Sequence, residues 1–228
     1  MTERRRHSAE KPSHAVRMGT AIPRREAPRL YLVTPPLGAP SAIADDLADA
    51  LNATDIAAVL LRLGEGDEPA LLDRIKALRI LIQSNGAALL LDGHAGLVGP
   101  AEADGAHLSG TDALRAATAS LKPKYIAGCG GLAERHDAML AGESGADYVM
   151  FGEPDATGHR PALDAVIERV AWWAEIFQIP CVAYAAGVEE VVALARAGAD
   201  FVAIGEAIWR DRRSFAAAVE HLAAEPVR

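Results

Sequence analysis

The stretch ADGAHLSGTD, from Ala103 to Asp112, contains one complete change from strand to helix. The apolar run GAHLS has the short length of a buried strand, and it stops on small residues. Thr111 and Asp112 are residue types that favour the first turn of a helix. We therefore expect a strand that ends near Ser109 and a helix that begins at Thr111.

The same unit recurs along the chain. Short apolar runs alternate with segments of helical period, and we count eight runs: RLYLVT, AAVLLR, AALLLD, GAHLS, YIAGCG, DYVMFG, PCVAYA and FVAIG. The runs are almost continuously apolar, as is typical of parallel strands covered by helices. The clearest helical period runs from Leu163 to Phe177, behind Pro161. Eight strand-helix units predict an α/β fold, a single (β/α)8 TIM barrel; a doubly wound open sheet is the alternative.

Composition sets limits on the class of protein. The chain has 228 residues, half of them apolar, and a formal net charge of -8. No run of eighteen apolar residues occurs, so we expect no membrane span. The acidic body argues against a nucleic-acid surface. Cys129 and Cys181 lie inside apolar runs, as core thiols do, and this pattern favours a reducing, cytoplasmic location.

The first 28 residues differ from the rest because they carry seven basic side chains against three acidic ones. We expect residues 1–28 to form a disordered basic leader and residues 29–228 to form the barrel. Contact with an anionic partner and a role as an organellar presequence are the alternatives for this leader.

In a TIM barrel, chemistry belongs at the carboxyl ends of the strands. Asp92 and Asp112 follow neighbouring strands there, and two carboxylates with substrate oxygens could hold Mg²⁺. The alternative is that both aspartates only cap helices. Gly187 and Gly205 follow the last two strands, where backbone N–H groups of barrels often bind phosphate; two tight turns are the alternative. We expect His107 to line the barrel interior.

Five segments in this order carry a family resemblance: LYLVT (30–34), DGAHLSGTD (104–112), GADYVMFG (145–152), IPCVA (179–183) and AGADFVAIGEAI (197–208). Together they resemble the thiamine phosphate synthase and thiazole tautomerase family from residue 29 onward. The resemblance implies a transferase that condenses hydroxymethylpyrimidine pyrophosphate with thiazole phosphate and uses Mg²⁺. It also leaves a homodimer as an open option.

The family's motifs are only partly retained. Of the pattern Gln-x-Arg-x-Lys after the second strand, only Arg62 remains, and Asn-Asp after the third strand becomes Asp92 and Gly93. Asp112 stands where the family has its other metal aspartate. The resemblance places the following residues in catalytic positions: Arg62, Thr157, His159 and Arg160. Other positions are replaced: Gly130 for a serine after the fifth strand, Ala185 and Ala186 for Gly-Gly after the seventh, and Glu206 for a serine after the eighth.

Three functions follow from this pattern. The first is a working thiamine phosphate synthase. The second is a catalytically degenerate family member that binds a phosphorylated ligand or is regulatory. The third is a sugar-phosphate isomerase or epimerase on the same barrel, with His159 or Glu153 as the proton carrier.

Overall fold

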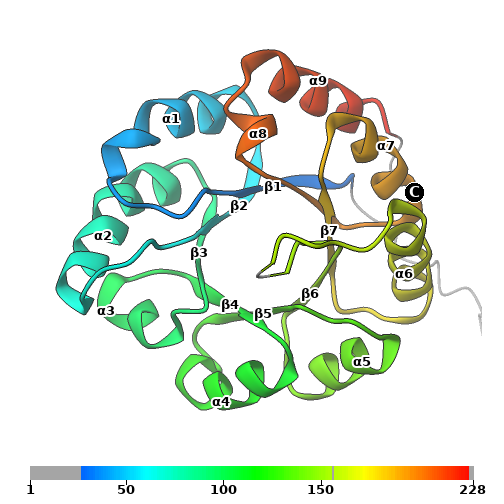
Figure 1. Cartoon of the computed structure of the whole chain (residues 1–228), viewed down its shortest axis with the longest axis horizontal. Helices are drawn as coiled ribbons and strands as arrows, with labels where there is room; N and C mark the ends of the chain where they lie inside the picture. The colour runs from blue at the N-terminus through cyan, green and yellow to red at the C-terminus, as the bar shows by residue number, and fades with distance from the viewer. Residues whose placement is uncertain (1–26, 156, 226–228) are drawn as a thin grey trace, which may run out of the picture.

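The computed structural model describes residues 27–155 and 157–225. Eight parallel strands form one closed barrel in sequence order, and β1 pairs with both β2 and β8 (Figure 1). The strands are β1 (Arg29–Val33), β2 (Ile56–Leu61), β3 (Ala88–Asp92), β4 (Gly105–Ser109), β5 (Ile126–Gly130), β6 (Tyr148–Phe151), β7 (Cys181–Ala185) and β8 (Phe201–Ile204). This closure confirms the predicted TIM barrel and excludes the open sheet, whose edge strands do not pair.

Helices surround the barrel in Figure 1. They are α1 (Ala44–Ala53), α2 (Glu68–Ser84), α3 (Val98–Ala101), α4 (Thr111–Leu121), α5 (Arg135–Glu143), α6 (Leu163–Ile176), α7 (Val188–Ala197), α8 (Glu206–Trp209) and α9 (Arg212–Ala223). The predicted helix start at Thr111 is confirmed. α6 begins at Leu163, just after the predicted Pro161, and α3 is only a single turn.

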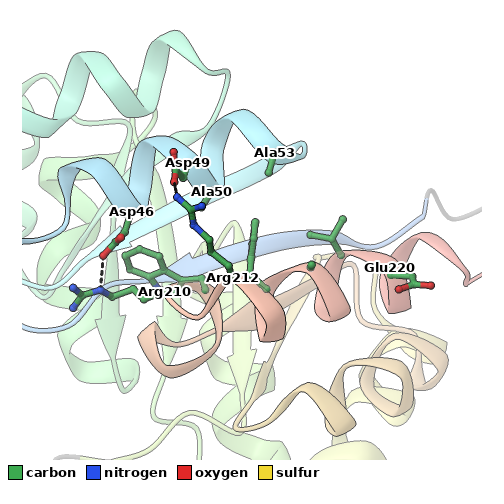
Figure 2. Close-up of a pocket in the computed structure, with 11 residues that line it drawn as sticks. Asp46, Asp49, Ala50, Ala53, Arg210, Arg212 and Glu220 are labelled. Carbon is green, nitrogen blue, oxygen red and sulfur yellow. Dashed lines mark hydrogen bonds and ion pairs between the residues drawn. The ribbon is translucent and has the colours of Figure 1, made fainter.

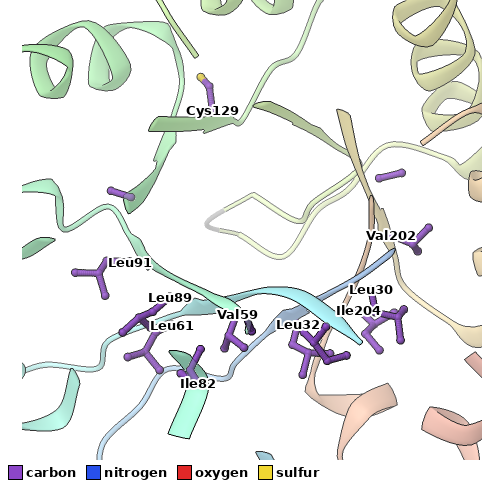
Figure 3. Close-up of a cluster of buried hydrophobic side chains, with 14 of the residues drawn as sticks. Leu30, Leu32, Val59, Leu61, Ile82, Leu89, Leu91, Cys129, Val202 and Ile204 are labelled. Atoms are coloured by element: carbon purple, nitrogen blue, oxygen red, sulfur yellow. The ribbon is translucent and has the colours of Figure 1, made fainter. Parts of the chain in front are cut away.

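The apolar side chains form two layers because strand residues alternate between the two faces of the sheet. On β1, Leu30 and Leu32 point away from the barrel centre, as Figure 3 shows, and belong to the cluster that includes helix residues. Tyr31 and Val33 point inward and fill the barrel. Both faces of each strand are therefore buried, which explains the almost continuous apolar runs in the sequence.

The predicted basic leader lies outside the described residues, except for Ala27 and Pro28. Its predicted disorder and the boundary at residue 28 therefore stay predictions. Within the described part of the chain, no helix combines the length and apolarity needed to cross a membrane.

Candidate functional site

A cavity of about 560 Å³ opens at the carboxyl ends of the strands. Its lining residues come from the strands β2, β3 and β4 and from the loops that follow β1, β2, β5 and β6. They are Pro36, Leu60, Arg62, Leu63, Asp92, His107, Ser109, Gly131, Glu153, Pro154 and Asp155. Among the described residues, Arg62 is the one arginine or lysine in this lining. The cavity lies where active sites of TIM barrels are found.

The centre of this site is a pair between Glu153, which follows β6, and His107 on β4. Glu153 Oε2 lies 3.1 Å from His107 Nε2, and Oε1 accepts a hydrogen bond from the backbone N–H of Gly131. His107 is buried, at 3% exposure, and the Glu153 side chain is 15% exposed. The predicted interior position of His107 is confirmed.

A line of hydrogen bonds continues from this pair into the barrel. Tyr148 Oη lies 2.9 Å from His107 Nδ1 and 2.9 Å from Tyr31 Oη. The rings of His107 and Tyr148 are stacked, with their centroids 5.7 Å apart. Four polar side chains from β1, β4, β6 and the loop after β6 thus satisfy one another in an otherwise apolar interior, as buried polar groups must.

Two glycines of β5 make room for this network. A Cβ atom on Gly130 would lie 1.9 Å from Glu153 Oε1 and 2.6 Å from His107 Nε2. A Cβ atom on Gly128 would lie 2.0 Å from Cζ of Tyr148. The Gly-x-Gly spacing places both glycines on the inner face of the strand. No residue with a side chain fits at either position without displacing the network.

The network shifts the pKa values of its members. Burial alone would lower the pKa of His107, but the negative charge of Glu153 and their hydrogen bond raise it above its ordinary value. Burial alone would raise the pKa of Glu153, but His107, the Gly131 N–H and Arg62 together lower it. The two shifts favour a carboxylate facing an imidazolium. Burial raises the pKa of Tyr148 far above its ordinary range, so its hydroxyl stays protonated.

Arg62 and Asp92, predicted for catalysis and metal binding, face each other in the cavity. Arg62 Nε donates to Asp92 Oδ2 at 3.2 Å, and each side chain is 33% exposed. The backbone N–H of Arg62 donates to Oγ1 of Thr34, which fixes the end of β2 against β1. The structure therefore brings these two predicted residues together as an ion pair.

Asp112 lies elsewhere. It does not line the cavity, its side chain is 99% exposed, and its neighbour is Arg115 at 3.6 Å, one turn along α4. Among the residues that the structure describes, no three His, Cys, Asp or Glu side chains cluster as metal ligands would. The predicted roles of Asp92 and Asp112 as a pair of metal ligands stay predictions.

The loop after β6 extends over the centre of the barrel in Figure 1 and carries the predicted catalytic residues Thr157, His159 and Arg160. Thr157 and His159 are exposed and shape the loop. Asp155 Oδ1 accepts hydrogen bonds from the backbone N–H of Thr157, from its hydroxyl and from the backbone N–H of His159, at 2.7 to 3.0 Å. These bonds lower the pKa of Asp155. Asp155, not Thr157 or His159, contributes to the cavity lining.

Arg160, the last predicted catalytic residue, is held by hydrogen bonds to other groups of the chain. Its Nη1 donates to both carboxylate oxygens of Glu190 on α7, at 2.8 and 3.0 Å. Nε donates to the carbonyl of Gly152, and Nη2 donates to the carbonyl of Tyr184. All three nitrogens of the guanidinium group are therefore engaged.

The predicted phosphate glycines both precede helices. Gly187 is the residue before α7 and Gly205 the residue before α8. Gly205 lines a smaller cavity of about 180 Å³ beside the first one, with which it shares Pro36 and Arg62. Tyr184, Ala186 and Glu206 also line this cavity.

Another cavity, of about 570 Å³, lies on the outside of the barrel between α1 and α9 (Figure 2). Both of its arginines form ion pairs: Arg210 with Asp46 at 2.9 Å and Arg212 with Asp49 at 2.7 Å. This cavity is remote from the strand ends, where the unusual polar network lies. The barrel mouth is therefore the better candidate for chemistry.

Comparison with known proteins shows the family of the chain. The sequence model of the family described as "Thiamine monophosphate synthase" matches residues 30–208. The chain belongs to this family. It is 40% identical over 194 residues to "Thiamine-phosphate synthase" of Rhodospirillum centenum, covering 84% of this chain and 94% of that protein. It is 38% identical over 208 residues to the protein of the same name in Hyphomonas neptunium, covering 88% and 94%. The predicted resemblance and a role in thiamine biosynthesis are thereby confirmed.

Solved structures support the same fold. The chain resembles thiamine phosphate pyrophosphorylase from Pyrococcus furiosus with a TM-score of 0.67 and 20% identity, covering 87% of this chain and 95% of that one. It also resembles a 3-hexulose-6-phosphate synthase with a TM-score of 0.64 and 16% identity, covering 86% and 100%. At these identities the likeness shows the barrel fold alone.

Sequence reasoning missed three members of the site. Tyr31 and Tyr148 stood in apolar runs that resembled ordinary core, although the small residues of YIAGCG indicated that something large fills the space beside β5. Glu190 was missed because acidic residues are common in the first turn of a helix. Only its contact with Arg160, 30 residues earlier, distinguishes it.

Proposed function

We propose that this chain joins a hydroxymethylpyrimidine pyrophosphate to a thiazole phosphate at the barrel mouth, in the reaction class of its family. The thiazole nitrogen forms a bond to the pyrimidine methylene carbon, the bond from that carbon to oxygen breaks, and pyrophosphate leaves with the electron pair. The observation that carries the proposal is the cavity lined by the Arg62 cation at one point and the Glu153 carboxylate at another.

The two charges suit the two ends of the breaking bond. The methylene carbon becomes cationic as pyrophosphate leaves, and a fixed carboxylate facing it would stabilise that charge. His107 keeps Glu153 ionised and immobile, because it lowers the pKa of Glu153 and holds Oε2 in place. Arg62 would bind the departing pyrophosphate, for which its planar guanidinium is suited. In this proposal Asp92 holds Arg62 toward the cavity.

Mg²⁺ is implied by the family, but the donor set does not fit a dedicated site. Asp92 faces the cavity and is already paired, whereas Asp112 faces solvent. Where Mg²⁺ is bound it supplies charge neutralisation for pyrophosphate. The predicted roles of Asp92 and Asp112 in metal binding stay predictions.

The predicted roles of the loop residues change in the proposal. Thr157 and His159 shape the loop over the cavity through Asp155 instead of contacting the reacting atoms. The phosphorylated pyrimidine is the substrate that Arg62 is suited to bind. A homodimer and a cytoplasmic location stay predictions.

A catalytically degenerate ligand-binding protein is the second candidate, because the Arg160 cation is neutralised by Glu190. The isomerase or epimerase is less well supported. A general base works best with a pKa near the working pH, and the pKa of Glu153 is lowered instead.

The test is product formation by the purified full-length chain. Pyrimidine pyrophosphate, Mg²⁺ and the thiazole phosphate are mixed with the protein, and pyrophosphate release is followed. Arg62→Ala should lower kcat/KM by about 100-fold or more, which corresponds to roughly 3 kcal/mol of lost charge stabilisation. Arg212→Ala, which removes an exposed arginine on α9, is the control. Absence of turnover, beside an active reference synthase, would favour the ligand-binding alternative.

A further inference from the structure

Tyr184 on β7 places a phenolic hydroxyl group beside the barrel mouth. It is the last residue but one of the strand, and its part-buried side chain lines the smaller cavity of about 180 Å³. Its backbone carbonyl accepts a hydrogen bond from Arg160 Nη2 at 3.3 Å. Among residues 27–155 and 157–225, no group forms a hydrogen bond with its hydroxyl.

This arrangement differs from that of the two tyrosines deeper in the barrel. The hydroxyls of Tyr31 and Tyr148 lie 2.9 Å apart, and Tyr148 also contacts His107. These groups are satisfied within the protein, as buried polar groups must be. Tyr184 keeps its apolar ring in the protein and presents its polar end to the cavity, as tyrosines at binding surfaces do. Its hydroxyl is therefore available to a bound molecule.

Gly205, which follows β8, makes room for this hydroxyl. Tyr184 pairs with Ala203 of β8, and Gly205 lies two residues further along, toward the same inner face. A Cβ atom on Gly205 would lie 2.5 Å from Tyr184 Oη. The glycine that we predicted to cradle phosphate therefore also leaves space for a side-chain donor at the same strand end.

The surroundings keep this hydroxyl protonated and place a cation near it. Burial raises the pKa of Tyr184, and the positive charges of Arg62 and Arg160 offset only part of this rise, so the phenol stays a donor at neutral pH. Arg62 lines both cavities. Glu206 also lines the smaller cavity, but its side chain is 47% exposed and lies 3.8 Å from Nη1 of Arg210. A neutral O–H donor with a nearby guanidinium group suits a phosphate oxygen.

We propose that Tyr184 is a substrate-binding residue, whose hydroxyl donates a hydrogen bond to a phosphate oxygen of a bound substrate. The inference rests on the proposed condensation, in which both substrates carry phosphate groups. The oxygen belongs either to the thiazole phosphate, because TIM barrels frequently bind phosphate after the seventh and eighth strands, or to the pyrophosphate that Arg62 would bind. In both cases the hydroxyl gains its partner only with the substrate, so its removal should weaken binding and leave folding unchanged.

Tyr184→Phe tests the proposal because it removes the hydroxyl and keeps the ring. Thiazole phosphate and, separately, inorganic pyrophosphate with Mg²⁺ are titrated calorimetrically into the full-length protein. The variant should weaken at least one of the two affinities by about tenfold or more, as expected for a lost hydrogen bond to a charged group, and should lower kcat/KM by a similar factor. Its urea midpoint should equal that of the wild type.

Tyr125→Phe is the matched control. Tyr125 is also part-buried, but it precedes β5 and so lies at the opposite end of the barrel from the mouth. Removal of its hydroxyl should change neither affinity and should leave kcat/KM within about twofold.

The affinity that falls identifies the phosphate group that Tyr184 binds. If no turnover occurs but Tyr184→Phe weakens the binding of either compound, the condensation fails and the role of Tyr184 stands. If turnover occurs and the variant keeps both wild-type affinities, the condensation stands and the role of Tyr184 is overturned. Binding of neither compound to the wild type also overturns it. So does a lowered urea midpoint of the variant, because the hydroxyl would then bond within the protein.

Discussion

Replacing Glu153 with glutamine tests whether the buried pair with His107 exists as an ion pair. The variant keeps the shape of the side chain and can still accept one hydrogen bond, but it removes the charge that faces the imidazolium. Removal of one partner from a buried ion pair costs about 3 to 5 kcal/mol. Because Glu153 is partly open to the cavity and glutamine retains a hydrogen bond, we expect a loss of about 2 to 3 kcal/mol in the free energy of unfolding.

The pH dependence gives this prediction its sign. The pKa of His107 is raised, so its contribution to stability is complete below its ordinary value of 6.5 and is lost as pH rises through the folded-state pKa. The pKa of Glu153 is lowered, so its contribution is present above its ordinary value of 4.5 and is lost as pH falls through the folded-state pKa. The pair therefore contributes most between about pH 4.5 and 6.5, and Glu153→Gln should lose most stability there.

Urea unfolding at pH 5.5 and at pH 9 measures the effect, with Glu175→Gln as the matched control at an exposed position of α6. The difference between wild type and Glu153→Gln should be at least about 1 kcal/mol larger at pH 5.5. An equal difference at the two pH values would show that His107 is neutral in the folded chain, and the reasoning on the charged pair would be wrong.

Two further substitutions probe the surroundings of this pair. Gly130→Ala should destabilise the chain by about 1 to 3 kcal/mol, because the added Cβ atom overlaps Glu153 and His107; in thermal unfolding, a change equal to that of Gly96→Ala, where nothing lies within 4 Å of the added atom, would contradict this packing. Asp112→Ala should leave turnover within about twofold, because its exposed carboxylate lies outside the cavity; a loss of about 100-fold that higher Mg²⁺ partly restores would instead support the predicted metal role of Asp112.

The sequence predicted the positions of the candidate residues better than it predicted their contacts. Arg62, Asp92 and Gly205 could be placed at the barrel mouth because each follows an apolar run, and parallel strands bring their carboxyl ends to one side. The sequence could not predict in the same way where a side chain beyond the strand end points. Asp112 has the expected position at the start of α4, yet its carboxylate points to solvent.

The sequence alone determined the barrel, because eight apolar runs separated by helical periods leave few ways to bury both faces of a sheet. Tertiary structure alone decided the chemistry of the mouth. Glu153 meets His107 across 46 residues, and Glu190 meets Arg160 across 30. Such pairs depend on the space left by glycines on the inner face of β5 and on the paths of the loops. These features arise only when the closed barrel fixes distant strands side by side, so no local pattern in the sequence records them.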